Sequence, residues 1–294
     1  MNIVMLSGGS GKRLWPLSNE IRSKQFIKIF RRENGIYESM IQRMYRQLRE
    51  AFSEADIVVT ASRAQIPTLH NQLGENVEIC VEPAGKNTFP ALALVAAWLK
   101  DVRCLKEDEP VLICPVDPYV EEDYYEALRS LWQRANTQEG LFLLGILPTY
   151  PSEKYGYILP AKDCEFGPVD AFWEKPSRDL AQQYISRGAL WNGGVFACRL
   201  GYLLERAHEG FSFADYDDLY AQYTSLNSVS FDYAVVEKEK KLQVLRFKGS
   251  WKDMGTWNTL TEAMEESCVG NVTLNDNCRN VHVIYEPRRY FGIR

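Results

Sequence analysis

Residues 3–17 read Ile3-Val4-Met5-Leu6-Ser7-Gly8-Gly9-Ser10-Gly11-Lys12-Arg13-Leu14-Trp15-Pro16-Leu17. The apolar run at 3–6 is typical of a buried strand, and a glycine-rich turn follows it directly. Three glycines within residues 8–11 leave backbone N–H groups open to a bulky anion, because no Cβ blocks its approach. Arg13 adds a guanidinium whose planar fork suits phosphate oxygens. The stretch therefore predicts a strand that ends in a phosphate-binding loop.

Neither of the two common glycine motifs for phosphate fits this loop. The spacing G-x-G-x-x-G of a dinucleotide site is absent, and so is the G-x-x-x-x-G-K-[ST] pattern of a P-loop. Taken alone, the glycines also fit an ordinary strand-to-helix turn. The residues that follow have to decide between the two interpretations.

Downstream of the loop, short apolar segments alternate with segments of helical periodicity. Helices are expected at 37–48, 64–73 and 91–99, and strands at 57–60, 77–81 and 111–114. This alternation predicts a mostly parallel sheet with helices on both faces. Ligands of such sheets bind at the carboxyl ends of the strands.

Composition excludes several classes of protein. A net charge of −5 over 294 residues argues against a general nucleic-acid surface. No apolar run approaches the roughly 18–20 residues of a membrane span. Seven scattered cysteines without a C-x-x-C pair and three histidines favour neither a disulfide scaffold nor a zinc site. With no signal-peptide pattern at its start, we expect a cytoplasmic protein with no membrane and no nucleic-acid partner.

The glycine-rich stretch, together with Lys24-Gln25-Phe26, resembles the N-terminal signature of the sugar-1-phosphate nucleotidyltransferases. The closest form is that of the bacterial mannose-1-phosphate guanylyltransferases, roughly G-G-S-G-T-R-L-W-P-L followed by P-K-Q-F. Lys12 stands where the family has Thr, and Ser23 stands where it has Pro. The resemblance implies catalytic roles for Arg13 and Lys24. It also implies a nucleotide-binding loop made of Leu6, Gly8, Gly9, Ser10, Gly11, Lys12 and Arg13.

Later segments match the same family in the same order, to about residue 262. Residues 82–88 are similar to E-P-x-x-R-N-T, with Lys86 in place of Arg, and the resemblance implies that Glu82 and Asn87 contact the nucleotide base. Capping of the following helix by Asn87 or Thr88 is the alternative.

Two aspartates are the implied magnesium ligands. Asp117 lies in a segment similar to P-x-D-H, in which Pro118 replaces the His, and Asp253 lies in a match to W-x-D-x-G-x-W. Mg²⁺ needs few protein carboxylates, because it keeps waters and takes phosphate oxygens. An aspartate that follows a strand is otherwise a common turn former.

The middle of the chain carries the implied sugar-phosphate contacts. Residues 172–176 resemble F-V-E-K-P, residues 190–196 resemble L-W-N-S-G-M-F with Gly193 in place of Ser, and residues 230–238 match S-F-D-Y-A-V-M-E-K. Asp232 could instead interact with the N-terminus of the helix that begins at Ser230, rather than with the sugar. The resemblance implies sugar-phosphate binding by Gly145, Tyr157, Glu174, Lys175, Asn192 and Asp232, and a catalytic role for Lys175 as well.

The predicted fold is α/β and Rossmann-like, with a mixed, mostly parallel sheet and helices on both faces, as in nucleotide-diphospho-sugar transferases. We expect this domain at 1–265 and a short C-terminal β extension at 266–294, truncated relative to the family's β-domain. Two short strands are expected in the extension, within 270–278 and 280–285.

The resemblance implies an enzyme that uses Mg²⁺ to transfer a nucleotidyl group from a nucleoside triphosphate to a sugar-1-phosphate. GTP and mannose-1-phosphate are the implied pair, giving GDP-mannose and pyrophosphate. Two alternatives stay open: the same reaction with another base or phosphorylated acceptor, and a non-catalytic regulator that binds nucleotide sugar. A homodimer is also left open.

Overall fold

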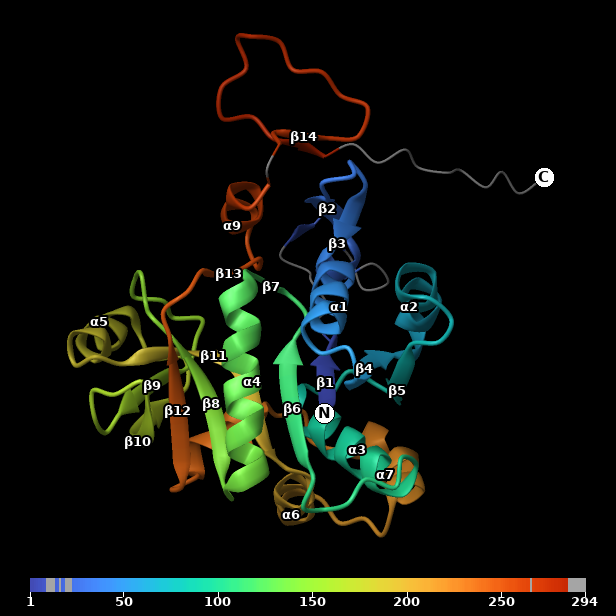
Figure 1. The fold of residues 1–294 in the computed structure, drawn as a ribbon, viewed down its shortest axis with the longest axis vertical. Coiled ribbons are helices and arrows are strands. Elements are labelled where there is room, and N and C mark those ends of the chain that lie inside the picture. Colours follow the sequence, from blue (N-terminus) through green and yellow to red (C-terminus); the bar gives the residue numbers. More distant parts are fainter. Residues whose placement is uncertain (9–13, 16, 19–22, 265, 285–294) are drawn as a thin grey trace.

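The computed structural model describes residues 1–8, 14–15, 17–18, 23–264 and 266–284 (Figure 1). One sheet of nine strands crosses the molecule, in the order β5-β4-β1-β6-β11-β8-β12-β10-β9. In that order the strands are Glu78–Glu82, Asp56–Ser62, Asn2–Leu6, Pro110–Pro115, Leu190–Arg199, Leu141–Ile146, Leu242–Phe247, Phe166–Trp173 and Tyr157–Pro160.

Strands β5, β4, β1 and β6 are parallel to one another, as are β8 and β12. Strands β11 and β10 run against their neighbours, and β9 pairs with both of them. The prediction of a mixed, mostly parallel sheet is therefore confirmed. The carboxyl ends of β1, β4, β5 and β6 meet at one edge of the sheet, together with the start of β11.

Two apolar cores lie on opposite faces of this sheet. Ile3 and Met5 of β1 belong to the first core, and Val4 between them belongs to the second, because successive side chains of a strand point to opposite faces. Helices α1 (Met40–Ala51), α2 (Ile66–Leu73), α4 (Glu122–Thr137) and α5 (Arg178–Ser186) contribute to the first core. The second core is built from α3 (Thr88–Asp101), α6 (Leu200–Gly210), α7 (Tyr216–Gln222) and α8 (Phe231–Ala234).

The predicted helix at 37–48 begins three residues late. Residues 37–39 form β3 (Tyr37–Ser39), which pairs with β2 (Lys28–Arg31). Ser39 then caps α1, since its side chain accepts from the Gln42 N–H and the Gln42 side chain accepts from the Ser39 N–H. Helical spacing alone placed Tyr37 in the helix, whereas the capping box fixes the boundary.

Short elements complete the fold. The 3₁₀ turns η2 to η5 cover Lys24–Phe26, Arg63–Gln65, Tyr223–Ser225 and Val236–Lys238. Strand β7 (Pro118–Val120) pairs with β13 (Trp251–Asp253), and α9 (Trp257–Glu262) follows β13. The helix predicted at 64–73 is divided in the structure. Its first residues belong to the turn η3, and α2 begins at Ile66 with a proline in its first turn.

The expected strand within 270–278 is wrong. The strand at this point is β14 (Cys268–Val269), which pairs in parallel with β15 (Val283–Ile284). Residue Asn275 explains the difference, because its side chain accepts from the Asn277 N–H and its carbonyl accepts from the Cys278 N–H, which turns the backbone. The boundary between residues 265 and 266 stays a prediction.

Glu266 ties the C-terminal segment to the β2–β3 hairpin. It forms an ion pair with Arg31, and the Tyr37 hydroxyl donates to it over 2.8 Å.

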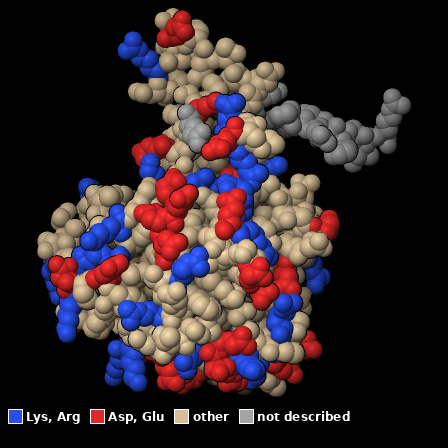
Figure 2. Space-filling model, viewed as in Figure 1, with Lys and Arg blue, Asp and Glu red and all other residues tan. Residues whose placement is uncertain are grey.

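Acidic and basic side chains are interspersed over the face shown in Figure 2, in keeping with the modest net charge. Within the described ranges, no helix has both the length and the apolar character that crossing a membrane requires.

Candidate functional site

The predicted nucleotide loop leaves the sheet at the carboxyl end of β1, where Leu6 pairs with Thr60 and Pro115 of the two flanking strands. The Gln25 side chain donates to the carbonyl of Ser7 over 2.6 Å, so η2 holds the start of the loop in place. Residues 9–13, and with them Gly9, Ser10, Gly11, Lys12 and Arg13, lie outside the described residues.

Glu82 ends β5 beside this loop. A Cβ at Gly8 would lie 3.3 Å from Glu82 Oε1, so the glycine allows the close approach. Glu82 is 5% exposed, and its Oε2 accepts from the Tyr223 hydroxyl over 3.1 Å. Its Oε1 has no hydrogen-bond partner among the described residues. Burial raises the pKa of Glu82 to about 7, although the bond from Tyr223 opposes the shift.

We predict that Glu82 makes folding stability depend on pH. Between the ordinary pKa of 4.5 and the folded-state pKa of about 7, the folded protein keeps a proton that the unfolded chain loses. The free energy of unfolding should therefore fall as pH rises through this window, by up to about 3 kcal/mol for this group.

The Glu82→Gln variant cannot ionise, so its stability relative to wild type should rise between pH 5 and pH 8. Urea unfolding at the two pH values measures the change, with Glu54→Gln at an exposed side chain as the control. An equal pH response of wild type and Glu82→Gln would contradict the prediction.

Asn87 caps α3. Its side chain accepts from the Thr88 N–H over 2.8 Å, and its backbone has a φ of 72° and a ψ of −177°, a strained conformation that residues other than glycine rarely adopt. Its side chain is exposed at the same edge of the sheet. Thr88 in turn accepts from the Phe231 N–H over 2.8 Å, which joins the start of α3 to α8. The capping interpretation is confirmed, and base contact by Asn87 stays a prediction.

Asp117 and Asp253 converge, although 136 positions separate them (253 − 117). Pairing of β7 with β13 sets Asp253 opposite Pro118, next to Asp117. The Lys24 Nζ lies 2.6 Å from Asp117 Oδ2 and 3.5 Å from Asp253 Oδ1. The Tyr155 hydroxyl donates to Asp253 Oδ2 over 3.4 Å. Three residues that the sequence singled out separately thus form one cluster.

The donor set of this cluster fits Mg²⁺. Both carboxylates are partly exposed, at 32% for Asp117 and 21% for Asp253, so an ion from solvent can reach them. The described residues contain no group of three or more His, Cys, Asp and Glu side chains that could hold a metal ion by themselves. Two carboxylates are enough for Mg²⁺ when phosphate oxygens and waters complete its shell.

A second cluster contains four of the predicted sugar-phosphate residues. Glu174 and Lys175 follow β10 and form an ion pair, and the Lys175 Nζ lies 5.8 Å from the centre of the Tyr233 ring. Asn192 donates to Asp232 Oδ1 over 2.7 Å. Burial, and then the nearby carboxylate of Glu174, raise the pKa of Asp232 to about 6. The cluster combines one cation with several groups able to bind hydroxyls.

The start of α8 bears on the two alternatives for Asp232. The Ser230 side chain accepts from the Tyr233 N–H, so it caps α8 as expected. The carboxylate of Asp232 accepts both from its own backbone N–H, in the first turn of α8, and from Asn192 in the second cluster. Asp232 therefore contacts the start of α8 and the second cluster at once, and its contact with the sugar phosphate stays a prediction.

Tyr155 and Gly156 connect the two clusters. Tyr155 reaches Asp253 with its hydroxyl, and its carbonyl accepts from the Lys175 N–H over 3.3 Å. The Gly156 carbonyl accepts from the Asn192 N–H over 2.8 Å. A Cβ at Gly156 would lie 2.7 Å from Glu174 Oε2, so only glycine fits without a shift. The aspartate cluster and the sugar-phosphate cluster are thus neighbours.

Gly145 and Tyr157, the other two predicted sugar-phosphate residues, are buried in the sheet. Gly145 pairs with Asn192 of the second cluster across β8 and β11, and a Cβ there would lie 2.5 Å from Leu190 Cδ1 and 2.7 Å from Val244 Cγ2. Tyr157 is fully buried. Its hydroxyl donates to the Ser152 carbonyl, and accepts from the Ser152 N–H and from Trp191 Nε1, at 2.8–3.0 Å. The Tyr157 side chain therefore does not reach the open edge, whereas a contact of the Gly145 backbone with the sugar phosphate stays a prediction.

Replacing Tyr157 with Phe should therefore destabilise the fold by about 1–3 kcal/mol, because three buried polar groups lose their partner. The Michaelis constant for a sugar phosphate should not change. Urea unfolding gives the free energy, with Tyr220→Phe as the control, since that hydroxyl accepts one exposed bond from Arg63. Unchanged stability with a raised KM would instead support a sugar contact.

Sequence reasoning missed Tyr223, the partner of Glu82. It lies on η4, 141 residues further along the chain, in no recognisable motif. Only the packing of the second core brings its hydroxyl to the end of β5. The contacts of Tyr155 and Gly156 with the two clusters likewise depend on distant parts of the chain, and no motif pointed to them.

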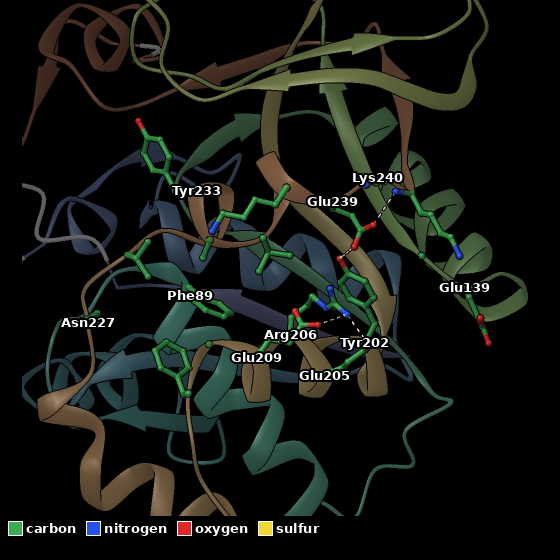
Figure 3. Close-up of a pocket in the computed structure, with 18 residues that line it drawn as sticks. Phe89, Glu139, Tyr202, Glu205, Arg206, Glu209, Asn227, Tyr233, Glu239 and Lys240 are labelled. Carbon is green, nitrogen blue, oxygen red and sulfur yellow. Dashed lines mark hydrogen bonds and ion pairs between the residues drawn. The ribbon is translucent and has the colours of Figure 1, made fainter.

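A pocket of about 990 Å³ lies elsewhere, on the amino-end side of β8 and β12 (Figure 3). Figure 3 shows Tyr202 donating to Glu239 and Arg206 pairing with Glu205 and Glu209 in its wall. None of the predicted site residues that the structure describes lines it. The candidate site is instead the open edge at the strand ends.

Comparisons with known proteins agree with the motifs. A model of the nucleotidyl transferase family matches residues 2–268. The chain is 30% identical over 318 residues to a mannose-1-phosphate guanylyltransferase of Escherichia coli K12, covering 96% of this chain and 64% of that protein. It is 32% identical over 304 residues to the xanthan biosynthesis protein XanB of Xanthomonas campestris pv. campestris strain B100, covering 95% of this chain and 63% of that protein. The chain thus spans less than two thirds of the length of these relatives.

A solved structure supports the fold. It is named as a mannose-1-phosphate geranyltransferase from Thermus thermophilus, and it matches with a TM-score of 0.74 and 28% identity. The match covers 91% of this chain and 81% of that one.

Proposed function

We propose an activity for this chain, which belongs to the nucleotidyl transferase family. It transfers a nucleotidyl group from a nucleoside triphosphate to a sugar-1-phosphate. One observation carries the proposal. Lys24, Asp117 and Asp253 converge at the edge of the sheet where Glu174, Lys175 and Asn192 also gather. The first group is suited to phosphates, and the second to a sugar and its phosphate.

The reaction is an in-line displacement at the α-phosphorus. An oxygen of the sugar phosphate forms the new bond to that phosphorus, and the bond to the departing pyrophosphate breaks. The attacking oxygen is already anionic near neutral pH, so no general base is needed. The protein has to position two polyanions and offset their repulsion. Lys175 and Lys24 supply positive charge, and Arg13 is predicted to add to it.

Asp117 and Asp253 would hold the magnesium ion in this proposal. When bound, Mg²⁺ supplies charge neutralisation to the phosphate oxygens. Tyr155 orients Asp253 through its hydroxyl, and the β7–β13 pairing keeps the two aspartates adjacent. This arrangement supports phosphate binding beside the two aspartates.

GTP and mannose-1-phosphate are the proposed substrates, and GDP-mannose is the proposed product. The names of the relatives support this pair. Glu82 adds a physical argument, because its carboxylate is an acceptor beside the predicted loop. Guanine offers N–H donors on the edge that such an acceptor would contact. The proposal requires a compartment that contains nucleoside triphosphates, which the cytoplasm does.

Steady-state release of pyrophosphate tests the substrate pair. The purified protein is assayed with Mg²⁺, each of the four common nucleoside triphosphates, and mannose-1-phosphate or glucose-1-phosphate. Highest kcat/KM for GTP with mannose-1-phosphate is expected. Turnover with another pair would support the same reaction but with a different nucleotide or sugar phosphate as substrate. Binding of GDP-mannose without any turnover would favour the non-catalytic regulator.

A further inference from the structure

The Lys24 ammonium lies between the carboxylates of the two predicted metal ligands, Asp117 and Asp253. It contacts one carboxylate oxygen of Asp117 and approaches one of Asp253. The Lys24 side chain is only 14% exposed, so the three charges meet in a partly shielded site. A cation between two carboxylates offsets the repulsion that would otherwise separate them. The Lys24 ammonium therefore occupies the position at which a divalent cation would meet both carboxylates.

The backbone that carries Lys24 is fixed, whereas its side chain can move. Phe26 of η2 packs in the first core at 2% exposure, and Gln25 is bonded to the Ser7 carbonyl. The lysine side chain is a compact charge on a flexible four-carbon stem. Its ammonium can thus leave the carboxylates without any change in η2.

We propose that Lys24 and a divalent cation compete for Asp117 and Asp253, and that binding of the cation releases the Lys24 ammonium for the incoming phosphate. The inference rests on the proposed function, whose phosphate would receive the ammonium. A metal–oxygen distance of about 2.0–2.1 Å for Mg²⁺ would place its charge next to the present position of Nζ. Like charges in a shielded site repel strongly, so both cannot stay.

This exchange gives Lys24 two positions with different roles. In the protein without metal it keeps the two aspartates together, on the strand pair β7–β13. Once displaced, the same ammonium can contact a phosphate at the edge of the sheet. Lys24 would therefore reach the substrate only when the metal site is filled.

Binding of Mn²⁺ to the protein without nucleotide or sugar phosphate tests the competition. Electron paramagnetic resonance measures the unbound ion, and thus the Kd. Lys24→Met keeps the stem and removes the charge, so its Kd for Mn²⁺ should be at least about tenfold lower than that of wild type. Lys28→Met, at an exposed side chain of β2, is the matched control and should leave the Kd unchanged. Adding Asp253→Asn to Lys24→Met should weaken binding again.

A folded Lys24→Met protein that binds Mn²⁺ no more tightly than wild type would overturn the inference. If that variant does not fold, Lys24→Gln takes its place with the same expected result. Failure of the proposed function looks different: wild type would bind Mn²⁺ but release no pyrophosphate with any substrate pair. Tighter binding by the Lys24 variants would then still establish the competition.

Discussion

Asp253→Asn is expected to lower kcat at least about 100-fold, because it removes one of the two carboxylates that would neutralise charge at the reacting phosphates. The fold should survive, since asparagine has nearly the same shape and can still accept from the Tyr155 hydroxyl. Pyrophosphate release at saturating substrates measures kcat, and thermal unfolding checks the fold.

Asp276→Asn is the matched control for this result. Asp276 is exposed in the loop between β14 and β15, and its replacement should leave kcat unchanged. Undiminished magnesium-dependent turnover of Asp253→Asn would remove Asp253 from the mechanism. A partial recovery of turnover with Mn²⁺ in place of Mg²⁺ would agree with a role as metal ligand.

Lys175→Met is expected to lower kcat/KM for the sugar phosphate by about 100-fold. Lys175 is the cation of the sugar-phosphate cluster, and its side chain is 47% exposed, so an anion can reach it. Methionine keeps an apolar stem of similar length and removes the charge that lies 5.8 Å from the centre of the Tyr233 ring. Initial rates at varied sugar phosphate and fixed GTP give the value.

Lys154→Met provides the comparison, because Lys154 is exposed on the loop that leads to Tyr155 but belongs to neither cluster. A similar loss in both variants would show that net charge matters more than position. An unchanged kcat/KM in Lys175→Met would exclude Lys175 as the contact for the sugar phosphate.

The parts of the fold that local signals determine could be predicted from the sequence. The strand at residues 2–6 and the strand at 110–115 are short apolar runs bounded by turn residues, and α3 is strongly apolar. The resemblance implied Asp117 as a metal ligand, and the structure places it just after β6, at the strand ends where ligands of such sheets bind. Ser230 was recognised as a cap because its signal spans only three residues.

Contacts that depend on register could not be predicted in the same way. Tyr157 and Gly156 are adjacent, and only the pairing of β9 with β10 and β11 decides which of them lies at the site. A shift of one residue would exchange their faces. Gly145 is a similar case, because its contacts with Leu190 and Val244 come from two other strands.

Formation of the nucleotide sugar is the most direct test of the central claim. Phosphorus NMR can follow the reaction of GTP with mannose-1-phosphate in the presence of the purified protein and Mg²⁺. The account predicts that pyrophosphate and the diphosphate signals of GDP-mannose appear together in equal amounts, and only when the sugar phosphate is present. Pyrophosphate that appears with GMP and without sugar phosphate, or no reaction with any nucleotide and acceptor, would contradict it.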